Sequence, residues 1–393
     1  MDLCSGLFLI PVDVLLKPIT LTCDHRVFFT RDAFALENAL LETVLAGRVL
    51  VFLDGGVASA RPDVAGLVES WMASRGPSLR LVAGGVVVVP GGEAGKNDWS
   101  LIERMWGVIN EYGVDRHSCV LVIGGGAFLD MAGFAVATAH RGIRLVRMPT
   151  TTLSQGDGGV GVKNGVNRFS KKNWVGAFAV PWAVVNDFSF LHGLPAREMR
   201  AGLIEGVKVA LLRDAVFFRL MEEQVEALAC LESAAVESVV RRGAELHFEH
   251  ITTGGDPFEL GSARPLDFGH WVAHKLEPIS EYLINHGEAV AIGMAVDLIY
   301  ARRLGLLSED DCARILALLE KMGFILYDSH LELVDADGES LVLRGLEEFR
   351  EHLGGQLTIT LVTGLGGRIE VHEMNLVVVR EAIEELRDRS AAG

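Results

Sequence analysis

The stretch CVLVIGGGAFLDMAGFAVATAHRGIRLVRMP, residues 119–149, decides the fold class because it joins two apolar runs through a glycine-rich turn and a helical segment. Both runs, 119–126 and 143–149, are apolar throughout, which is typical of strands that are buried on both faces of a parallel sheet. The same alternation of short apolar runs and helical stretches surrounds this unit. The neighbouring predicted elements are the strands RVLVFLD (48–54) and LRLVAGGVVVVP (79–90) and the helices 33–46, 64–74 and 98–112. We therefore expect an α/β fold with a Rossmann-like parallel-sheet domain.

Length and charge limit the possible classes of protein. A chain of 393 residues with 50% hydrophobic content can bury sizeable cores and suggests two domains. From Pro195 onward the strand pattern gives way to helical periodicity, so we expect a sheet domain at 1–190 and a mostly α-helical domain at 191–393. The net charge of −16 argues against a nucleic-acid partner, because such proteins carry a basic patch.

Cysteine usage and the N-terminal run bear on the compartment. The five cysteines are dispersed without CxxC spacing, which indicates reduced thiols in a cytoplasmic protein. The apolar run LFLIPVDVLLKPITL (7–21) is broken by Pro11, Asp13, Lys17 and Pro18. It is too short for a membrane span and lacks the basic start of a signal peptide, so we expect an edge strand or a packed arm and no membrane partner.

The carboxyl ends of the predicted strands carry groups suited to a nucleotide, which parallel sheets bind at that edge. Asp54 ends the first strand, and Glu93 and Lys96 lie in the loop after the second. The glycines at 124–126 end the third strand, and Asp130 follows in the next helix. A glycine-rich turn lets backbone N–H groups approach a pyrophosphate. The motif lacks GxGxxG spacing, so a tight turn that needs positive φ explains it equally well.

The stretch MPTTTLSQGDGGVGVKNGVNRFSKKNWVGAF (148–178) concentrates cations in an otherwise acidic chain. Thr150 and Thr151 supply hydroxyls at a strand end, and Asp157 lies among glycines. The clustered cations and the adjacent amide are Lys163, Arg168, Lys171, Lys172 and Asn173. Interleaved glycine and asparagine allow close approach of a ligand, so we expect a substrate phosphate here. The alternative is a solvated basic loop.

Three histidines lie in the apolar stretch LDFGHWVAHKLEPISEYLINHGEAV (266–290). His270 and His274 are four residues apart, so they share one face of a helix. His286 begins a second apolar run after a short break. Neutral imidazoles from neighbouring helix ends are good zinc ligands. The alternative is a set of hydrogen-bonded core histidines.

The helical stretch REMRAGLIEGVKVALL (197–212) supplies a candidate carboxylate ligand. Its apolar composition predicts that Glu205 and Lys208 are buried on one face, three residues apart. A buried glutamate needs either a metal or a cationic partner, and an internal Glu205–Lys208 ion pair is the competing explanation. Glu205 with two of the histidines would leave an open metal position, which is the pattern of a catalytic zinc site.

Several ordered motifs together resemble the sugar phosphate cyclases of the 3-dehydroquinate synthase superfamily. GGGAFLDMAGFAVATAHRG is similar to the family's GGGxxxDxxGFxAxxxxRG, and MPTTTLSQGD to its PTTLLSQVD. GLIEGVK is similar to GLAEVIK, LDFGHWVAH is similar to LNxGHTxGH, and HGEAVAIGM matches outright. The resemblance covers roughly residues 54–366. It implies NAD and a divalent metal, Zn²⁺ or Co²⁺, as cofactors, a sugar phosphate as substrate, and a homodimer.

The resemblance also assigns roles to individual positions. The implied metal ligands are Glu205, His270 and His286. The implied NAD contacts are Asp54, Glu93, Lys96, Gly125, Gly126, Asp130, Thr150, Thr151, Asp157, Lys163, Lys172, Phe190, Leu191, His192 and Gly193. The implied substrate and catalytic positions are Asp157, Lys163, Lys172, Asn173, Lys208, Arg264, Asp267, His274 and His352, and Arg141 would reach into the partner subunit's site.

The implied reaction oxidises a ring hydroxyl with NAD⁺, eliminates phosphate, returns the hydride and closes a carbocycle by an intramolecular aldol step. Three departures from 3-dehydroquinate synthases bear on the substrate. Asp267 replaces an asparagine, AELHFEHITTGGD (244–256) lacks a lysine, and His352 is the closest counterpart of a late lysine. Losing cations and gaining an acid disfavours a carboxylate substrate.

These departures resemble cyclases that act on sedoheptulose 7-phosphate, such as 2-epi-5-epi-valiolone synthases. Those enzymes usually have proline where this chain keeps His274. The sequence GSARPLDFGHWVAHKLE (261–277) is also similar to the corresponding sequence of synthase-like cyclases of bacterial Ebo clusters. We therefore predict a heptulose phosphate cyclase. The alternatives are a true 3-dehydroquinate synthase and a metal-dependent polyol dehydrogenase. A catalytically dead binding protein is disfavoured because every implied metal ligand is present.

Overall fold

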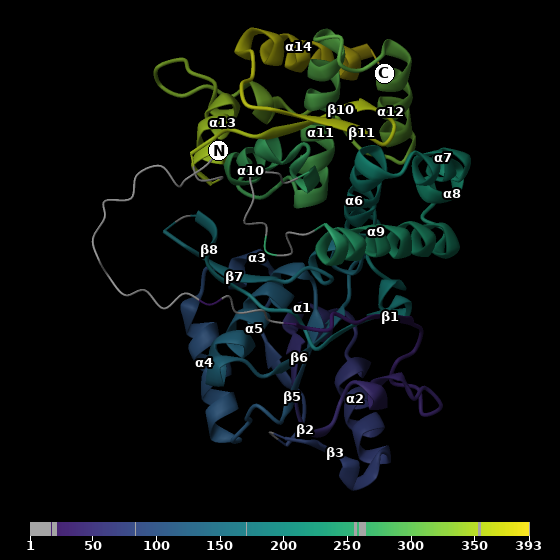
Figure 1. The fold of residues 1–393 in the computed structure, drawn as a ribbon, viewed down its shortest axis with the longest axis vertical. Coiled ribbons are helices and arrows are strands. Elements are labelled where there is room, and N and C mark those ends of the chain that lie inside the picture. Colours follow the sequence, from purple (N-terminus) through teal and green to yellow (C-terminus); the bar gives the residue numbers. More distant parts are fainter. Residues whose placement is uncertain are drawn as a thin grey trace.

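The computed structural model describes residues 17, 22–82, 84–169, 171–254, 258, 265–352 and 355–392. The N-terminal run 7–21, apart from Lys17, and Arg264 lie outside the described residues, as does the side chain of His352. A sheet with its covering helices forms one half of the molecule, and a group of helices with a small hairpin forms the other (Figure 1).

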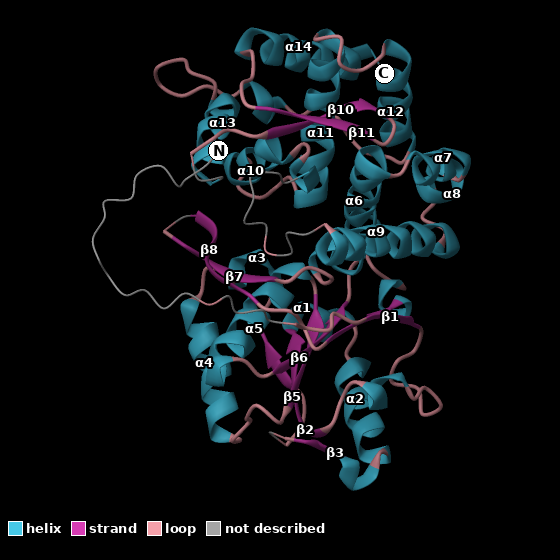
Figure 2. Ribbon diagram, in the orientation of Figure 1, coloured by secondary structure: helices cyan, strands magenta, loops and turns pink. Residues whose placement is uncertain are grey.

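The predicted parallel sheet is confirmed. Its strands follow the order β1-β9-β6-β5-β2-β3, β4 also pairs with β2, and every pair is parallel (Figure 2). The strands are β1 (Val27–Thr30), β2 (Gly47–Asp54), β3 (Leu79–Leu81), β4 (Val87–Val89), β5 (Cys119–Gly124), β6 (Arg144–Pro149) and β9 (Ala183–Asp187). Because Asp54 pairs with Val89 and Gly124 with Pro149, their carboxyl ends lie along one edge of the sheet.

Helices cover both faces of this sheet, as apolar strands require. Along β2 the side chains alternate: Leu53 packs on one face and Phe52 on the other. The first face is covered by α2 (Asp63–Ser74), and the second by α4 (Trp99–Glu111) and α5 (Gly126–Thr138). The predicted helices 64–74 and 98–112 therefore form.

Two predicted elements differ in the structure. The predicted helix 33–46 is wrong: this stretch contains only the 3₁₀ turn η1 (Leu40–Thr43). Asp32 has a left-handed φ of +50°, and the side chains of Asn38 and Asp187 hydrogen-bond to the backbone around residues 31–33, which holds the chain in a turn there. The predicted strand 79–90 is divided into β3 and β4, because Gly84 and Gly85 both have positive φ.

The basic stretch after β6 forms a hairpin, so the alternative of a solvated basic loop is wrong as a description of its backbone. β7 (Lys163–Arg168) pairs antiparallel with β8 (Lys171–Phe178), and this hairpin lies beside the boundary between the two halves (Figure 1). Arg147 fixes the start of this hairpin. Its fully buried guanidinium donates hydrogen bonds to the carbonyl oxygens of Gly161 and Lys163 and to Asn164 Oδ1.

The remaining elements are mostly helical, as predicted. The longer helices are α6 (Ala196–Arg213), α7 (Ala215–Glu223), α9 (Ser233–Thr253), α10 (His270–Ile279), α11 (His286–Arg303), α12 (Glu309–Lys321), α13 (Leu341–His352) and α14 (Leu376–Ala392). The short ones are α1 (Gly55–Ala60), α3 (Gly92–Gly95), α8 (Val225–Ala229), η2 (Gly76–Ser78), η3 (Ala139–Arg141), η4 (Ser154–Gly158), η5 (Phe188–Leu191), η6 (Pro265–Asp267) and η7 (Ser329–Glu332). Within the described residues, no helix combines the length and the apolar composition needed to cross a bilayer.

The helical half also contains a hairpin of β10 (Ile359–Gly364) and β11 (Gly367–Val371). Helices α6, α10 and α11 contribute to one large apolar core in this half. The division into domains at residue 190, within η5, stays a prediction.

Glycines bring the helices of this half into backbone contact. A Cβ on Gly293 of α11 would lie 2.0 Å from the carbonyl oxygen of Gly269, the residue before α10. A Cβ on Gly287 would lie 2.3 Å from the carbonyl oxygen of Ala201 in α6. The start of α10, the start of α11 and the middle of α6 therefore lie close together because these positions lack side chains.

A buried carboxylate reinforces the contact between α10 and α11. Asp297 of α11 is fully buried and accepts hydrogen bonds from Trp271 Nε1 (2.9 Å) and Gly269 N (3.1 Å). Burial disfavours its ionised form and outweighs both hydrogen bonds, which raises the pKa of Asp297 to about 7. The folded protein therefore holds a proton on this carboxyl that the unfolded chain releases at lower pH.

We expect Gly293→Ala to destabilise the protein by about 1–3 kcal/mol, because the new methyl group must displace the turn before His270. Gly107 of α4 provides a control, since a Cβ there meets nothing within 4 Å. Gly107→Ala should be neutral or stabilising by about 0.5–1 kcal/mol. Urea unfolding of both variants measures the difference; equal stabilities would contradict the packing argument.

We expect the stability of the protein to depend on pH through Asp297. Folding raises the pKa of Asp297. The stabilisation that comes from its protonated carboxyl is therefore complete below the ordinary pKa of 3.8 and is lost as the pH rises through about 7. The free energy of unfolding should therefore fall relative to Asp297→Asn by roughly 1.4 kcal/mol per pH unit between about pH 5 and 7, and then level off. A difference that stays constant across urea titrations at these pH values would refute this.

Candidate active site

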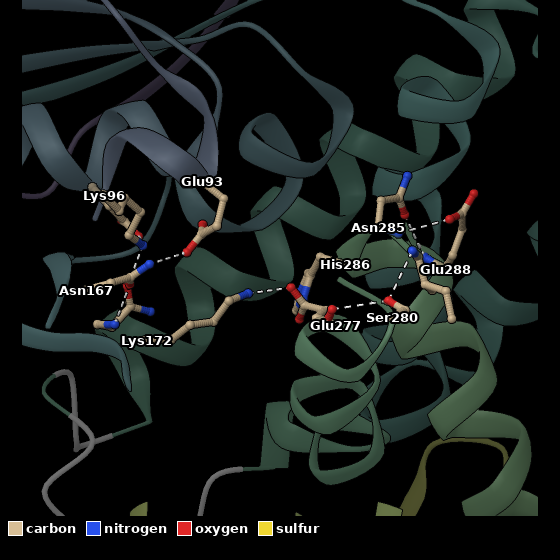
Figure 3. A network of polar contacts seen from close by, with 12 residues as sticks. Glu93, Lys96, Asn167, Lys172, Glu277, Ser280, Asn285, His286 and Glu288 are labelled. Carbon is tan, nitrogen blue, oxygen red and sulfur yellow. Dashed lines mark hydrogen bonds and ion pairs between the residues drawn. The ribbon is translucent and has the colours of Figure 1, made fainter. Parts of the chain in front are cut away.

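The two predicted histidine ligands are each the first residue of a helix. His270 begins α10 after Gly269, whose left-handed φ of +77° turns the chain into the helix. His286 begins α11 after Asn285. A reciprocal capping box fixes this start: Glu288 N donates to Asn285 Oδ1 (2.9 Å), and Asn285 N donates to Glu288 Oε2 (3.0 Å) (Figure 3). Both imidazoles are thus held at rigid helix ends.

The structure brings the three predicted metal ligands together. One ligand atom each from Glu205, His270 and His286 lies within 4.8 Å of the others, and His286 Nε2 is 4.0 Å from Glu205 Oε1. His274 lies one turn further along α10, with its ring centroid 5.5 Å from that of His270. It is not one of the three grouped residues, and its predicted contact with the substrate stays a prediction.

Outer hydrogen bonds orient both imidazoles. His270 Nδ1 lies 3.1 Å from the carbonyl oxygen of Phe268, and His286 Nδ1 lies 3.0 Å from Glu277 Oε1. Because each Nδ1 is engaged by an acceptor, it carries the proton and Nε2 keeps its lone pair for a metal. Glu277 was missed by the sequence analysis. Its spacing of seven residues from His270, which places it on the same helix face, is the signal that could have identified it.

Glu205 is buried in a way that fits a metal ligand. Its side chain is 3% exposed, and neither carboxylate oxygen accepts a hydrogen bond from the described residues, although Lys208 makes an ion pair with it. The Glu205–Lys208 ion pair and the grouping of Glu205 with the two histidines are therefore both present. The ion pair and metal binding, which were alternative explanations for a buried Glu205, do not exclude each other. Burial would lower the pKa of Lys208, but the negative charges of Glu205 and Asp157 outweigh it and raise that pKa.

The positive charge of Lys208 also affects His270. Burial, followed by the nearby Lys208, holds the pKa of His270 well below its ordinary value. His270 is therefore a neutral imidazole at neutral pH, which is the form that binds a metal.

A second group of charges surrounds Asp157, which lies in the single π-helical turn η4. Its Oδ1 is 2.5 Å from Nδ1 of His247, a residue of α9 that the sequence analysis did not single out. Burial would raise the pKa of Asp157, but the charges of His247, Lys208 and Lys163 outweigh it and hold the pKa below its usual range. Asp157 is thus an anion placed between the sheet and the helical half.

The strand ends predicted to bind NAD form a cradle in which side chains and glycines lie close together. Asp54 caps α1 by accepting a hydrogen bond from Gly56 N (2.8 Å). A Cβ on Gly124 would lie 2.9 Å from Asp54 Cβ, and one on Gly91 would lie 2.3 Å from Asp54 Oδ1. Gly125 has a φ of −74°, so the alternative of a turn that needs positive φ is wrong, and close approach explains the glycines. The hydroxyl of Thr150 is buried here and finds no hydrogen-bond partner in the described part of the chain.

Further predicted cofactor residues join one polar network at this edge (Figure 3). Lys96 Nζ lies 3.0 Å from Asp130 Oδ2 and also donates to Asn173 Oδ1. Asn167 donates to Glu93 Oε1 (2.8 Å) and accepts from the backbone N–H of Asn173 (2.9 Å). The network fixes Asn173, whose φ of +52° is left-handed.

The predicted cations of the hairpin divide into two groups. Lys163 lies near Asp157, and Lys172 makes an ion pair with Glu277 of α10. Arg168 and Lys171 pair across the hairpin turn, and Lys171 lies 3.9 Å from Glu351. The structure therefore places Lys163 and Lys172 toward the site and places the other two at the turn.

The remaining predicted residues are placed as follows. Asp267 ends η6, close enough to Lys208 for its charge to raise the pKa of that lysine. Phe190 and Leu191 end η5 after the carboxyl end of β9, and His192 and Gly193 follow. Arg141 precedes β6, at the opposite edge of the sheet. Arg264 and the side chain of His352 lie outside the described residues.

Comparisons with known proteins identify the family. The 3-dehydroquinate synthase N-terminal family matches residues 86–201, and the 3-dehydroquinate synthase C-terminal family matches residues 202–337. A 2-epi-5-epi-valiolone synthase from Streptomyces glaucescens is 34% identical over 92% of this chain and 91% of its own length. A 3-dehydroquinate synthase from Cereibacter sphaeroides (strain ATCC 17029 / ATH 2.4.9) is 36% identical over 77% of this chain and 81% of its own length.

A solved structure shows the same likeness in three dimensions. The 2-epi-5-epi-valiolone synthase from Streptomyces hygroscopicus subsp. jinggangensis 5008, with NAD⁺ and Zn²⁺ bound, superposes with a TM-score of 0.84 at 26% identity. The superposition covers 95% of this chain and all of that one. The fold, the grouped ligands and the extent of these matches agree, and the chain belongs to the 3-dehydroquinate synthase family.

Proposed function

We propose that the protein is an NAD- and zinc-dependent sugar phosphate cyclase, a lyase that eliminates phosphate from a heptulose phosphate. The observation that carries this proposal is the group of Glu205, His270 and His286 beside the ionised Asp157. This group lies between the helical half and the strand ends suited to NAD. The relative solved with both NAD⁺ and Zn²⁺ bound supports the choice of cofactors.

In the proposed reaction, Glu205, His270 and His286 would hold the metal. Bound zinc would make a coordinated hydroxyl more acidic, and bound NAD⁺ would supply the hydride acceptor. Asp157 is held as an anion that can orient positively charged or hydrogen-bonding groups, and the cationic Lys208 stabilises the negative charge that develops beside it. Lys163 faces the same space and is the cation we assign to the substrate phosphate.

The charge around Lys208 favours a substrate without a carboxylate, and we propose sedoheptulose 7-phosphate. Glu205, Asp157 and Asp267 all act on this one lysine, so a further carboxylate there meets net repulsion. A true 3-dehydroquinate synthase is the second candidate, because His274 is kept and the Cereibacter relative is 36% identical.

We further propose a homodimer that works in the cytoplasm. Arg141 precedes the six-residue β6, about 20 Å from the carboxyl edge of the sheet, so it is far from the site of its own chain, and the resemblance assigns it to the partner subunit's site. The cytoplasmic assignment rests on the scattered cysteines, of which the described Cys23, Cys119, Cys230 and Cys312 are unbridged.

We expect purified protein with NAD⁺ and Zn²⁺ to release phosphate from sedoheptulose 7-phosphate without net NADH accumulation. The measurement is a phosphate assay run beside absorbance at the NADH band. Turnover of only the carboxylated sugar phosphate of 3-dehydroquinate synthases would overturn the substrate proposal. Net NADH formation from a polyol would instead indicate a dehydrogenase.

Asp267→Asn should shift preference toward the carboxylated sugar phosphate by about tenfold in the ratio of kcat/KM values, because one repulsive charge near Lys208 is removed. Asp310→Asn, at an exposed position in α12, serves as the control and should leave the ratio unchanged. An unchanged ratio in the Asp267 variant would remove Asp267 from the substrate argument.

A further inference from the structure

Glu277 connects the two halves of the molecule. It lies in α10 with its side chain 4% exposed, and its two oxygens have different partners. Oε2 makes an ion pair with Lys172 of the β7–β8 hairpin, and Oε1 lies 3.0 Å from His286 Nδ1 (Figure 3). One buried carboxylate therefore contacts both a hairpin of the sheet half and a ligand of the proposed metal.

Lys172 has its cationic end in an environment that favours this contact. The nitrogen lies 5.9 Å from the ring centroid of Tyr282, and Glu93 adds a second negative charge nearby. Burial would lower the pKa of Lys172, but the charges of Glu277 and Glu93 outweigh it and raise that pKa. If the hairpin moved away, Glu277 would keep a buried negative charge with only His286 as partner, which is costly.

The hairpin end of this contact is tied to the NAD cradle. Lys172 is followed by Asn173, which accepts a hydrogen bond from Lys96 and donates its backbone N–H to Asn167. Lys96 in turn pairs with Asp130 of α5. A continuous series of contacts thus runs from Asp130 in the cradle, through the backbone at 172–173, to the imidazole of His286.

We propose that Glu277 is a positioning residue that couples occupancy of the cofactor cradle to the metal site. When the hairpin is held in place, Lys172 fixes Glu277, and Glu277 holds His286 with Nε2 toward Glu205 and His270. Cofactor and zinc then bind cooperatively, and by linkage each tightens the other by the same factor. This inference rests on the proposed function only for the identity of the two ligands.

Zinc affinity, measured by competition with a chelator with and without saturating NAD⁺, tests the coupling. In the wild-type protein NAD⁺ should tighten zinc binding at least about fivefold. Glu277→Gln should weaken zinc binding by about 10–100-fold and abolish the effect of NAD⁺. Lys172→Met should abolish the NAD⁺ effect, measured at NAD⁺ concentrations that saturate this variant, and Lys172→Arg should restore part of it.

Two matched variants control for loss of charge alone. Lys171→Met removes the neighbouring hairpin cation, which pairs with Glu351, and Glu348→Gln removes an exposed partner of Lys275 in α10. Both should keep the wild-type zinc affinity and the NAD⁺ effect. Backbone hydrogen exchange gives a second readout: zinc should slow exchange in 163–178 of the wild-type protein but not of Glu277→Gln.

The outcomes separate this inference from the proposed function. Binding of zinc and NAD⁺ without mutual effect, or full coupling in Lys172→Met, would overturn the inference alone. Wild-type zinc affinity in Glu277→Gln would do the same. Wild-type protein that binds neither ligand would overturn the proposed function as well. Coupling in a protein that fails to release phosphate from any heptulose phosphate would support the inference and overturn the proposed function.

Discussion

The rest of the site depends on the negative charge of Glu205, which is buried in the middle of α6. An uncompensated carboxylate in such a place costs several kcal/mol, so cationic or metal partners must converge on it. Packing prevents the helix from moving the charge toward solvent. A Cβ on Gly202 would lie 2.1 Å from the backbone N of Leu153, and one on Gly206 would lie 2.6 Å from Val239. The backbone contacts that stabilise the fold therefore also hold the charge in place.

Helix ends explain why so many acids gather around the two histidines. The N-termini of α10 and α11 carry partial positive charge from their unpaired N–H groups, which disfavours a cation beside them. Glu205, Glu277 and Asp267 lie close to these ends and supply negative charge. The histidines gain rigid positions from the helix starts, while the carboxylates offset the electrostatic cost of placing a metal there.

Sequence reasoning identified what local periodicity and short motifs determine. The parallel sheet follows from apolar runs, and the three metal ligands follow from family motifs. It missed Glu277 and His247, whose partners Lys172 and Asp157 are 105 and 90 residues away. The spacing of Glu277 from His270 marks it as a residue of the same helix face, but no local pattern signals the contact with Lys172 or the contact between His247 and Asp157. The wrong helix at 33–46 has the same origin, since Asp187 satisfies backbone groups there from a distant strand.

A count of charges at the site connects its geometry to the proposed substrate. Each inward cation already faces an acid: Lys172 faces Glu277, Lys208 faces Glu205, and Lys163 faces Asp157. These pairs leave little net positive charge for a phosphate of nearly two negative charges, in a chain whose total is −16. A divalent metal bound by Glu205, His270 and His286 would add positive charge to the site as a whole. A second anionic group on the substrate would still have no free cation opposite it among the described residues, and Asp267 would repel it. By this argument the site suits a neutral sugar that carries a single phosphate.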